Sequence, residues 1–254
     1  MTNTQITALW RWPVKGLGGQ TLDKVTVSAG ELFPFDRAFA IENGPSDFDA
    51  ANPVHVAKLN FLCGVSQPTA HRVSASYEEQ TGLLTITALD GRSLTIDPSQ
   101  PGQLEALAAE LVEDGVRGPL KLRKADDLEA GHGFTDVPGR WVSIQNRASI
   151  AMLEKLVDAS LDPRRLRANM LVDGWDAFAE EDLIGKAIQL GTAKAEIMEP
   201  INRCRNIDVN PDNAERDQTL VRTLQGMRGK RSLGVYAQIT DAGSMAPGDL
   251  VKIL

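Results

Sequence analysis

The chain has 254 residues, of which 42% are hydrophobic and 24% charged, and it carries a formal net charge of −7. Such an acidic chain is not expected to bind nucleic acid, because phosphate backbones need a basic surface. Its two cysteines, Cys63 and Cys204, are too few for a disulfide scaffold and indicate a reducing compartment, so we expect a cytoplasmic protein. No apolar stretch approaches the roughly 20 residues of a membrane helix and no signal peptide is predicted, so we expect no membrane anchor.

The first hundred residues are predicted to be mainly β-structure. Short segments rich in alternating or β-branched residues are separated by turn residues, and Asp90-Gly91 predicts a hairpin between residues 84 and 96. The predicted strands are 6–10, 22–27, 37–41, 73–76, 83–88 and 93–96. Many short strands at this spacing favour a small barrel.

The rest of the chain mixes helices with further strands. Apolar residues recur at helical spacing in residues 101–114 and 149–159. Strands are predicted at 168–172, 187–190, 195–201, 234–240 and 250–254. Charges and glycines between Pro119 and Gly133 indicate a boundary, which divides the chain into domains of residues 1–124 and 125–254. The predicted fold class is mixed α+β, mainly β.

Cys204 is the residue that most clearly predicts chemistry. It lies between Arg203 and Arg205, and the turn-prone segment 208–211 follows it. Adjacent cations stabilise a thiolate, the form of cysteine that attacks electrophiles and binds soft metals. The alternative interpretation is an inert, buried cysteine in a strand. A structural zinc site is not expected, because the chain has no CxxC pair and its three histidines are scattered.

Five sequence blocks, in order, span nearly the whole chain. They are Trp12-Pro13-Val14-Lys15-Gly16, Phe35-Asp36-Arg37-Ala38-Phe39, Arg167-Ala168-Asn169, the Cys204 segment, and Gly234-Val235-Tyr236 with Pro247-Gly248-Asp249. In these blocks the chain resembles the MOSC-domain proteins that carry an N-terminal β-barrel module. That group includes the mitochondrial amidoxime-reducing components and their bacterial relatives. The resemblance implies a β-barrel-like module over residues 1–124 and a MOSC β-barrel with a few helices over residues 125–254.

The resemblance also implies that the chain binds the molybdenum cofactor (Mo-molybdopterin, a pyranopterin with a terminal phosphate). Cys204 matches the family's molybdenum ligand. The positions expected to hold the cofactor are Lys15, Gly16, Arg37, Arg167, Asn169, Asn202, Arg203 and Tyr236. Arginine suits this role because its planar fork forms paired bonds with phosphate oxygens, while lysine supplies a compact charge. Without the resemblance, the cations would be interpreted as surface residues and Tyr236 as an ordinary strand residue.

Several positions depart from the pattern of the resembled family, among them Asn210, which replaces an aspartate. Asn202 stands where many relatives have serine, and Leu183 stands where a tryptophan is common, which changes the shape expected of the substrate pocket. Asp208 occupies a position often held by threonine. A carboxyl group four residues after the metal ligand is a candidate catalytic proton source if burial raises its pKa. The alternative is a loop residue that caps a turn.

The leading hypothesis is a molybdenum-cofactor-dependent oxidoreductase that reduces N-hydroxylated compounds such as amidoximes and N-hydroxylated bases. Because no Cys-rich iron–sulfur module is found, electrons are expected from a separate protein of the ferredoxin, flavin reductase or cytochrome b5 type. The alternative is a carrier of the cofactor or of sulfur, in which Cys204 holds a persulfide. A third hypothesis is a non-catalytic binding module in which Cys204 is a core residue.

Overall fold

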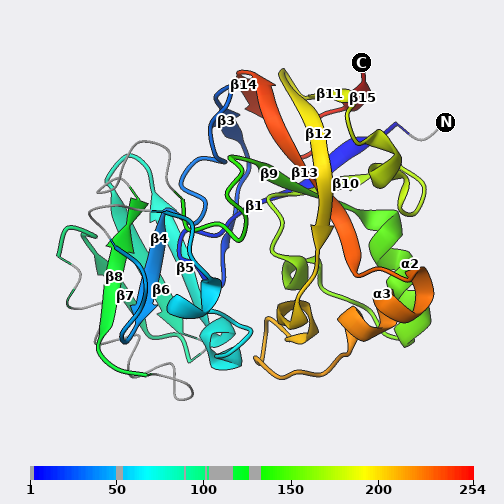
Figure 1. Ribbon diagram of the computed structural model, residues 1–254. Helices are drawn as coiled ribbons and strands as arrows, with labels where there is room; N and C mark the ends of the chain where they lie inside the picture. Colours follow the sequence, from blue (N-terminus) through cyan, green and yellow to red (C-terminus); the bar gives the residue numbers. More distant parts are fainter. Residues whose placement is uncertain (1–2, 50–53, 89, 101, 103–116, 126–132) are drawn as a thin grey trace.

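The computed structural model describes residues 3–49, 54–88, 90–100, 102, 117–125 and 133–254. In these residues the chain folds into two adjacent modules that are mainly β-structure (Figure 1). The strands are β1 (Gln5–Arg11), β2 (Gln20–Thr21), β3 (Val25–Val27), β4 (Phe39–Asn43), β5 (Val73–Glu78), β6 (Leu83–Ala88), β7 (Ser93–Ile96), β8 (Leu120–Lys124), β9 (Val142–Asn146), β10 (Met170–Asp173), β11 (Ala187–Leu190), β12 (Ala193–Asn202), β13 (Ser232–Asp241), β14 (Gly243–Met245) and β15 (Val251–Ile253). The helices are α2 (Arg147–Val157) and α3 (Leu220–Arg228), and 3-10 turns form η1 (Lys58–Asn60), η2 (Pro68–Arg72), η4 (Pro163–Leu166), η5 (Ala179–Leu183) and η6 (Arg205–Asp208).

The larger module is one eight-stranded sheet that curls back on itself. Its strand order is β15-β11-β12-β13-β9-β10-β1-β2, so the first strand of the chain lies near one end and the last strand at the other. Backbone hydrogen bonds from Ile6 N to Asp249 O (2.9 Å) and from Val251 N to Thr4 O (2.8 Å) join these two ends. The sheet is therefore barrel-like, and β1 completes it.

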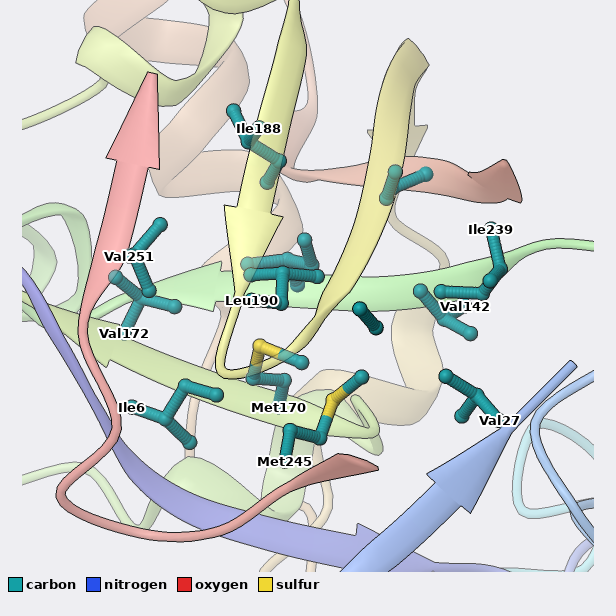
Figure 2. Close-up of a cluster of buried hydrophobic side chains, with 14 of the residues drawn as sticks. Ile6, Val27, Val142, Met170, Val172, Ile188, Leu190, Ile239, Met245 and Val251 are labelled. Carbon is teal, nitrogen blue, oxygen red and sulfur yellow. The ribbon is translucent and has the colours of Figure 1, made fainter. Parts of the chain in front are cut away.

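The pattern of buried and exposed residues in β1 explains why this N-terminal strand belongs to the larger module. Ile6 and Leu9 are fully buried, whereas Gln5 and Thr7 are exposed. Ile6 lies in a cluster of buried side chains that includes Met170, Val172 and Leu190, as Figure 2 shows. Burial of such side chains is the main stabilising term of the module.

The smaller module contains a three-stranded sheet, β5-β6-β7, and the β4–β8 pair. Its core is an apolar cluster that includes Val14, Phe39, Ile41 and Leu62. Isolated bridges extend the strands: Val14 pairs with Phe39, and Gly18 pairs with Ser74. The segment that follows β1 is thus built into the smaller module, and residues 12–18 pass directly from one module to the other.

Helices α2 and α3 lie side by side against the larger module (Figure 1). Asn146 caps α2, because its side chain accepts a hydrogen bond from Ala148 N at 3.0 Å. Buried leucines of both helices, including Leu153 and Leu224, pack with Leu166 and Ile207. This packing fixes the turns η4 and η6. No helix of the described residues is long and apolar enough to cross a membrane.

The predicted mainly β, mixed α+β fold is confirmed. The strands predicted at 83–88, 93–96 and 187–190 coincide with β6, β7 and β11, and the hairpin pairs Leu84 with Ile96 as expected. The helix predicted at 149–159 is α2, which begins two residues earlier. The helix predicted at 101–114 lies outside the described residues. The boundary between residues 124 and 125 stays a prediction.

The sequence did not indicate β9 or α3. Strand β9 is central and fully buried, yet Ser143, Gln145 and Asn146 are polar, so the strand shows no apolar alternation. Helix α3 is only nine residues long, and its buried residues are Leu220 and Leu224 alone.

If β1 completes the larger module, Ile6→Ala should lower the free energy of unfolding of the whole chain by about 2–5 kcal/mol, because it leaves a cavity in the core. Urea denaturation would measure the loss. Gln5→Ala, one residue away on the exposed face of the same strand, is the control and should change the value by less than about 0.5 kcal/mol. Equal effects of the two substitutions would contradict this role of β1.

Candidate functional site

A cavity of about 300 Å³ lies where the two modules meet. The smaller module contributes Lys15, Gly16, Arg37, Lys58, Cys63 and Gly64 to its lining. The larger module contributes Arg167, Asn169, Asn202, Arg203, Cys204, Asn206 and Tyr236. Apart from Asp208, every residue that the sequence predicted for the site lines this cavity. The fold therefore gathers residues that are more than two hundred positions apart.

Cys204 lies just after the end of β12, where the chain turns into η6. Its backbone is extended, with φ −111° and ψ 170°. The register of β12 against β13 shifts between Pro200 and Asn202, so the regular sheet ends just before the cysteine. The thiol is free and half-buried. Cys204 is therefore open to a ligand in the cavity.

Arg203 is held rigidly beside the thiol. Its guanidinium donates to Leu233 O from Nε and to Leu166 O from Nη1, both at 2.8 Å. The side chain is only 7% exposed, and Nη2 is buried without a hydrogen-bond partner among the described residues. Burial lowers the pKa of Arg203 to about 10, so the group remains a cation at neutral pH. An unpaired, buried cationic donor fits an anionic ligand.

Two further arginines, Arg37 and Arg167, have left-handed backbone conformations, with φ +49° and +51°. Such conformations cost non-glycine residues roughly 1–2 kcal/mol, so the surrounding structure must enforce them. Both guanidinium groups lie over the Trp12 ring, at 6.0 and 4.5 Å from its centroid. Arg37 Nη2 also donates to Arg167 O at 2.7 Å. Burial, with Arg37 close by, lowers the pKa of Arg167 to about 9.

The smaller module adds a lysine pair that shares one carboxylate. Lys15 Nζ donates to Asp136 Oδ1 at 2.6 Å, and Lys58 Nζ lies 3.4 Å from Asp136 Oδ2. Burial opposes the charge of Lys58, but Asp136 and Cys204 raise its pKa. Gly16 follows Lys15 with φ +86°, and a Cβ there would lie 2.4 Å from Leu62 O. Only glycine fits this position.

The remaining predicted residues contribute in different ways. Asn169 is buried and its Oδ1 accepts from Ser143 N and Oγ, so its amide joins β9 to the start of β10. Asn202 is exposed at the cavity rim. Tyr236 packs on Trp141 with ring centroids 5.6 Å apart, and burial raises the pKa of its phenol.

Two positions singled out in the sequence lie away from the cavity. The Asp208 carboxylate accepts from Val221 N (3.3 Å) in the first turn of α3 and is buried, which raises its pKa. This geometry favours the capping alternative, and its role as a proton source stays a prediction. Leu183 is buried in the core of the larger module, so its departure from the family pattern affects that core.

Sequence reasoning missed Lys58, His71, Asp136 and Asn206. His71 is buried, and its Nε2 lies 2.9 Å from Asn206 Oδ1. Burial and the nearby Arg167 lower the pKa of His71 to about 4. Lys58 and His71 lie in short 3-10 turns, which show no periodic pattern, so no local signal could have placed them here.

The site thus combines a half-buried thiol with a basic cavity between two β-rich modules. Family models match residues 3–127 as the MOSC N-terminal beta barrel domain and residues 131–252 as the MOSC domain. Together they account for nearly the whole chain. The chain belongs to the MOSC-domain proteins with an N-terminal β-barrel domain, and the resemblance seen in the sequence is confirmed.

Curated proteins that are similar to this chain include molybdenum cofactor sulfurases. That of Drosophila pseudoobscura pseudoobscura is 28% identical over 131 residues, which is 48% of this chain and 16% of the relative. That of Drosophila erecta is 32% identical over 94 residues, 36% of this chain and 12% of the relative. The chain thus matches only about a sixth or less of the length of these relatives.

Solved structures of similar proteins are more distant. The YuaD protein from Bacillus subtilis has a TM-score of 0.47 at 14% identity, covering 99% of this chain and 96% of that one. YiiM from Geobacillus stearothermophilus has a TM-score of 0.35 at 16% identity, covering 44% of this chain and 53% of that one.

The depressed pKa of His71 predicts a pH dependence of stability. As the pH falls from 6.5 to about 4, the unfolded chain binds a proton that the folded chain does not. The free energy of unfolding should therefore fall by about 3 kcal/mol over this window through His71 alone. In urea titrations at several pH values, His71→Gln should remove that part of the loss. The exposed His55→Gln is the control; parallel curves for wild type and His71→Gln would refute the assignment.

Proposed function

We propose that this protein binds the molybdenum cofactor through Cys204 and uses it to reduce N-hydroxylated compounds. One observation carries the proposal: a half-buried thiol and six cationic side chains converge on one cavity of an acidic protein. The cations are Lys15, Arg37, Lys58, Arg165, Arg167 and Arg203. Membership of the MOSC family and relatives named molybdenum cofactor sulfurase support the link to this cofactor.

The residues of the cavity fit the anionic part of the cofactor. A terminal phosphate carries roughly two negative charges and strong acceptor oxygens. Arg203 Nη2 supplies a buried donor with no other partner among the described residues. Arg37 and Arg167 add two guanidinium groups held by Trp12, and Lys15 adds a point charge. Because these groups are fixed before a ligand arrives, little ordering cost is added on binding.

The donor set around the thiol fits a metal that arrives with ligands of its own. No cluster of three or more His, Cys, Asp or Glu side chains suited to a metal ion occurs among the described residues. A metal at Cys204 would therefore take one thiolate from the protein and would have to bring its other ligands with the cofactor, and molybdenum binds thiolate sulfur well. When bound, the cofactor would supply two electrons that, with two protons, convert the N–OH group to N–H and water.

The protein's own groups would bind and orient the substrate. Burial raises the pKa of Tyr236, so the phenol keeps its proton at neutral pH and can donate a hydrogen bond. Lys58 remains a cation at the smaller module's side of the cavity.

The electrons would come from a separate donor protein of the ferredoxin, flavin reductase or cytochrome b5 type. We place the protein in the cytoplasm.

A second candidate function is a carrier of the cofactor or of sulfur. The name of the curated relatives, molybdenum cofactor sulfurase, favours it, and a half-buried thiol could hold a persulfide as readily as a metal. In that case Cys204 would hand over a group without turnover.

The first test is the metal content of protein made in a host that synthesises the cofactor. The wild type should hold molybdenum in about equimolar amount, and Cys204→Ala should lose it at least about tenfold or show a changed molybdenum spectrum. The loaded protein should reduce an amidoxime with an artificial electron donor. A wild type without molybdenum would sink the proposal, and a labile persulfide on Cys204 would then favour the carrier.

A matched pair of variants tests the anion-binding role of Arg203. Arg203→Met should weaken cofactor retention roughly 10–100-fold, because it removes charge-assisted hydrogen bonds. Arg205→Met removes the same charge on the other side of Cys204, but Arg205 is exposed and does not line the cavity. Its retention should match the wild type. Cofactor retained after dialysis would be quantified for both, and thermal unfolding would confirm that both fold; equal losses would contradict a specific role for Arg203.

A further inference from the structure

The two modules meet in a hydrogen bond at the cavity wall, next to Cys204. Asn206, two residues after the cysteine, lines the cavity from the larger module. Its Oδ1 lies 2.9 Å from Nε2 of His71, which belongs to η2 of the smaller module. Seen from the sequence alone, both residues belong to unrelated loops.

The surrounding residues are arranged so that this hydrogen bond can form. A Cβ on Gly64 would lie 2.0 Å from Asn206 Oδ1 and 2.2 Å from His71 Nε2, so only glycine leaves room for the pair. Arg216 holds the two loops together, because Nη1 donates to Arg205 O at 3.0 Å and Nη2 to Gly64 O at 3.2 Å. The position of Asn206 is therefore fixed from both modules.

The charge state of His71 sets the orientation of the Asn206 amide. Burial lowers the pKa of His71, the positive charges of Arg167, Arg216 and Arg165 lower it further, and the ring is therefore neutral at physiological pH. A neutral ring carries one proton, and an amide oxygen can only accept, so Nε2 is the nitrogen that donates. The oxygen of Asn206 is thereby occupied. Its Nδ2 group, with two N–H donors, has no partner within the part of the chain that the structure describes.

We propose that Asn206 is a specificity-determining residue whose amide N–H donates to an acceptor atom of the substrate beside Cys204, with His71 as the residue that positions it. The inference rests on the proposed reduction of N-hydroxylated compounds and deepens it. An amidoxime presents a neutral oxygen and a nitrogen lone pair, both of which accept hydrogen bonds. Its product, an amidine, is protonated at neutral pH and has only N–H donors.

Asn206 would therefore distinguish the substrate from the product. A donor aimed at the ligand stabilises the amidoxime and is left without an acceptor against the amidinium. Lys58 and Arg167, which line the same cavity, oppose the cationic product further. Release of the product is thus favoured by the same group that binds the substrate.

The test measures the dissociation constants of benzamidoxime and benzamidine for the cofactor-loaded protein by calorimetry. We expect the wild type to prefer benzamidoxime, and Asn206→Leu, which keeps the size but removes the donor, to reduce that preference about tenfold. His71→Leu should do the same, because the amide loses its fixed orientation. His71→Gln, which retains an N–H donor, should restore the preference to within about twofold. An unchanged preference in Asn206→Leu, or failure of His71→Gln to restore it, would overturn the inference.

Two further measurements keep the outcome unambiguous. The ¹⁵N signals of the His71 ring should show the proton on Nε2; a proton on Nδ1 would overturn the positioning role, because the Asn206 amide would then be reversed. Molybdenum content and thermal unfolding should match the wild type in all three variants. Absence of molybdenum from the wild type would count against the proposed reductase alone; the ratio of the two dissociation constants, then measured on the cofactor-free protein, and the ring tautomer would still decide the role of Asn206.

Discussion

The contacts of Trp12 connect the site to the whole structure. Trp12 is the first residue after β1 of the larger module, and the chain that follows it enters the smaller module. Its Nε1 donates to Ala168 O at 2.9 Å, and its backbone N donates to Asp36 Oδ1 at 2.9 Å. The same ring lies under the guanidinium groups of Arg37 and Arg167. One buried indole therefore links the two modules and holds two cations at the cavity, where their mutual repulsion would otherwise separate them.

The burial of positive charge at the cavity favours one kind of ligand, an anion. Burial lowers the pKa of both Arg167 and Arg203, which shows that their charged forms are destabilised in the protein alone. Asp36 pairs with Arg37 and Asp136 with Lys15, so two of the cations already have a carboxylate. Arg203 has backbone carbonyls only. A bound anion would relieve the destabilised charges, and a neutral ligand would not.

Much of the fold could be predicted from the sequence because it has local signals: the patterns of short strands gave β6, β7 and β11. Cys204 stood out through its flanking arginines, whereas Arg37 was predicted only through the resemblance of short motifs to a family. The residues that were missed have no such signal. His71 acquires its role only because Gly64 leaves room for Asn206, and this contact joins residues 135 positions apart. Tertiary packing creates it, so no sequence window contains it.

The two modules contribute different properties to the cavity. The larger one holds Cys204 and the buried Arg203, whose backbone partners lie in its own turns and strands. The smaller one contributes Lys58, on a short turn, and His71, which acts through its hydrogen bond to Asn206. Changes in the smaller module can therefore alter which ligand lies against the thiol while the thiol's own support is unchanged. The cavity therefore depends on both modules: the larger one holds the thiol, and the smaller one supplies part of the wall that faces it.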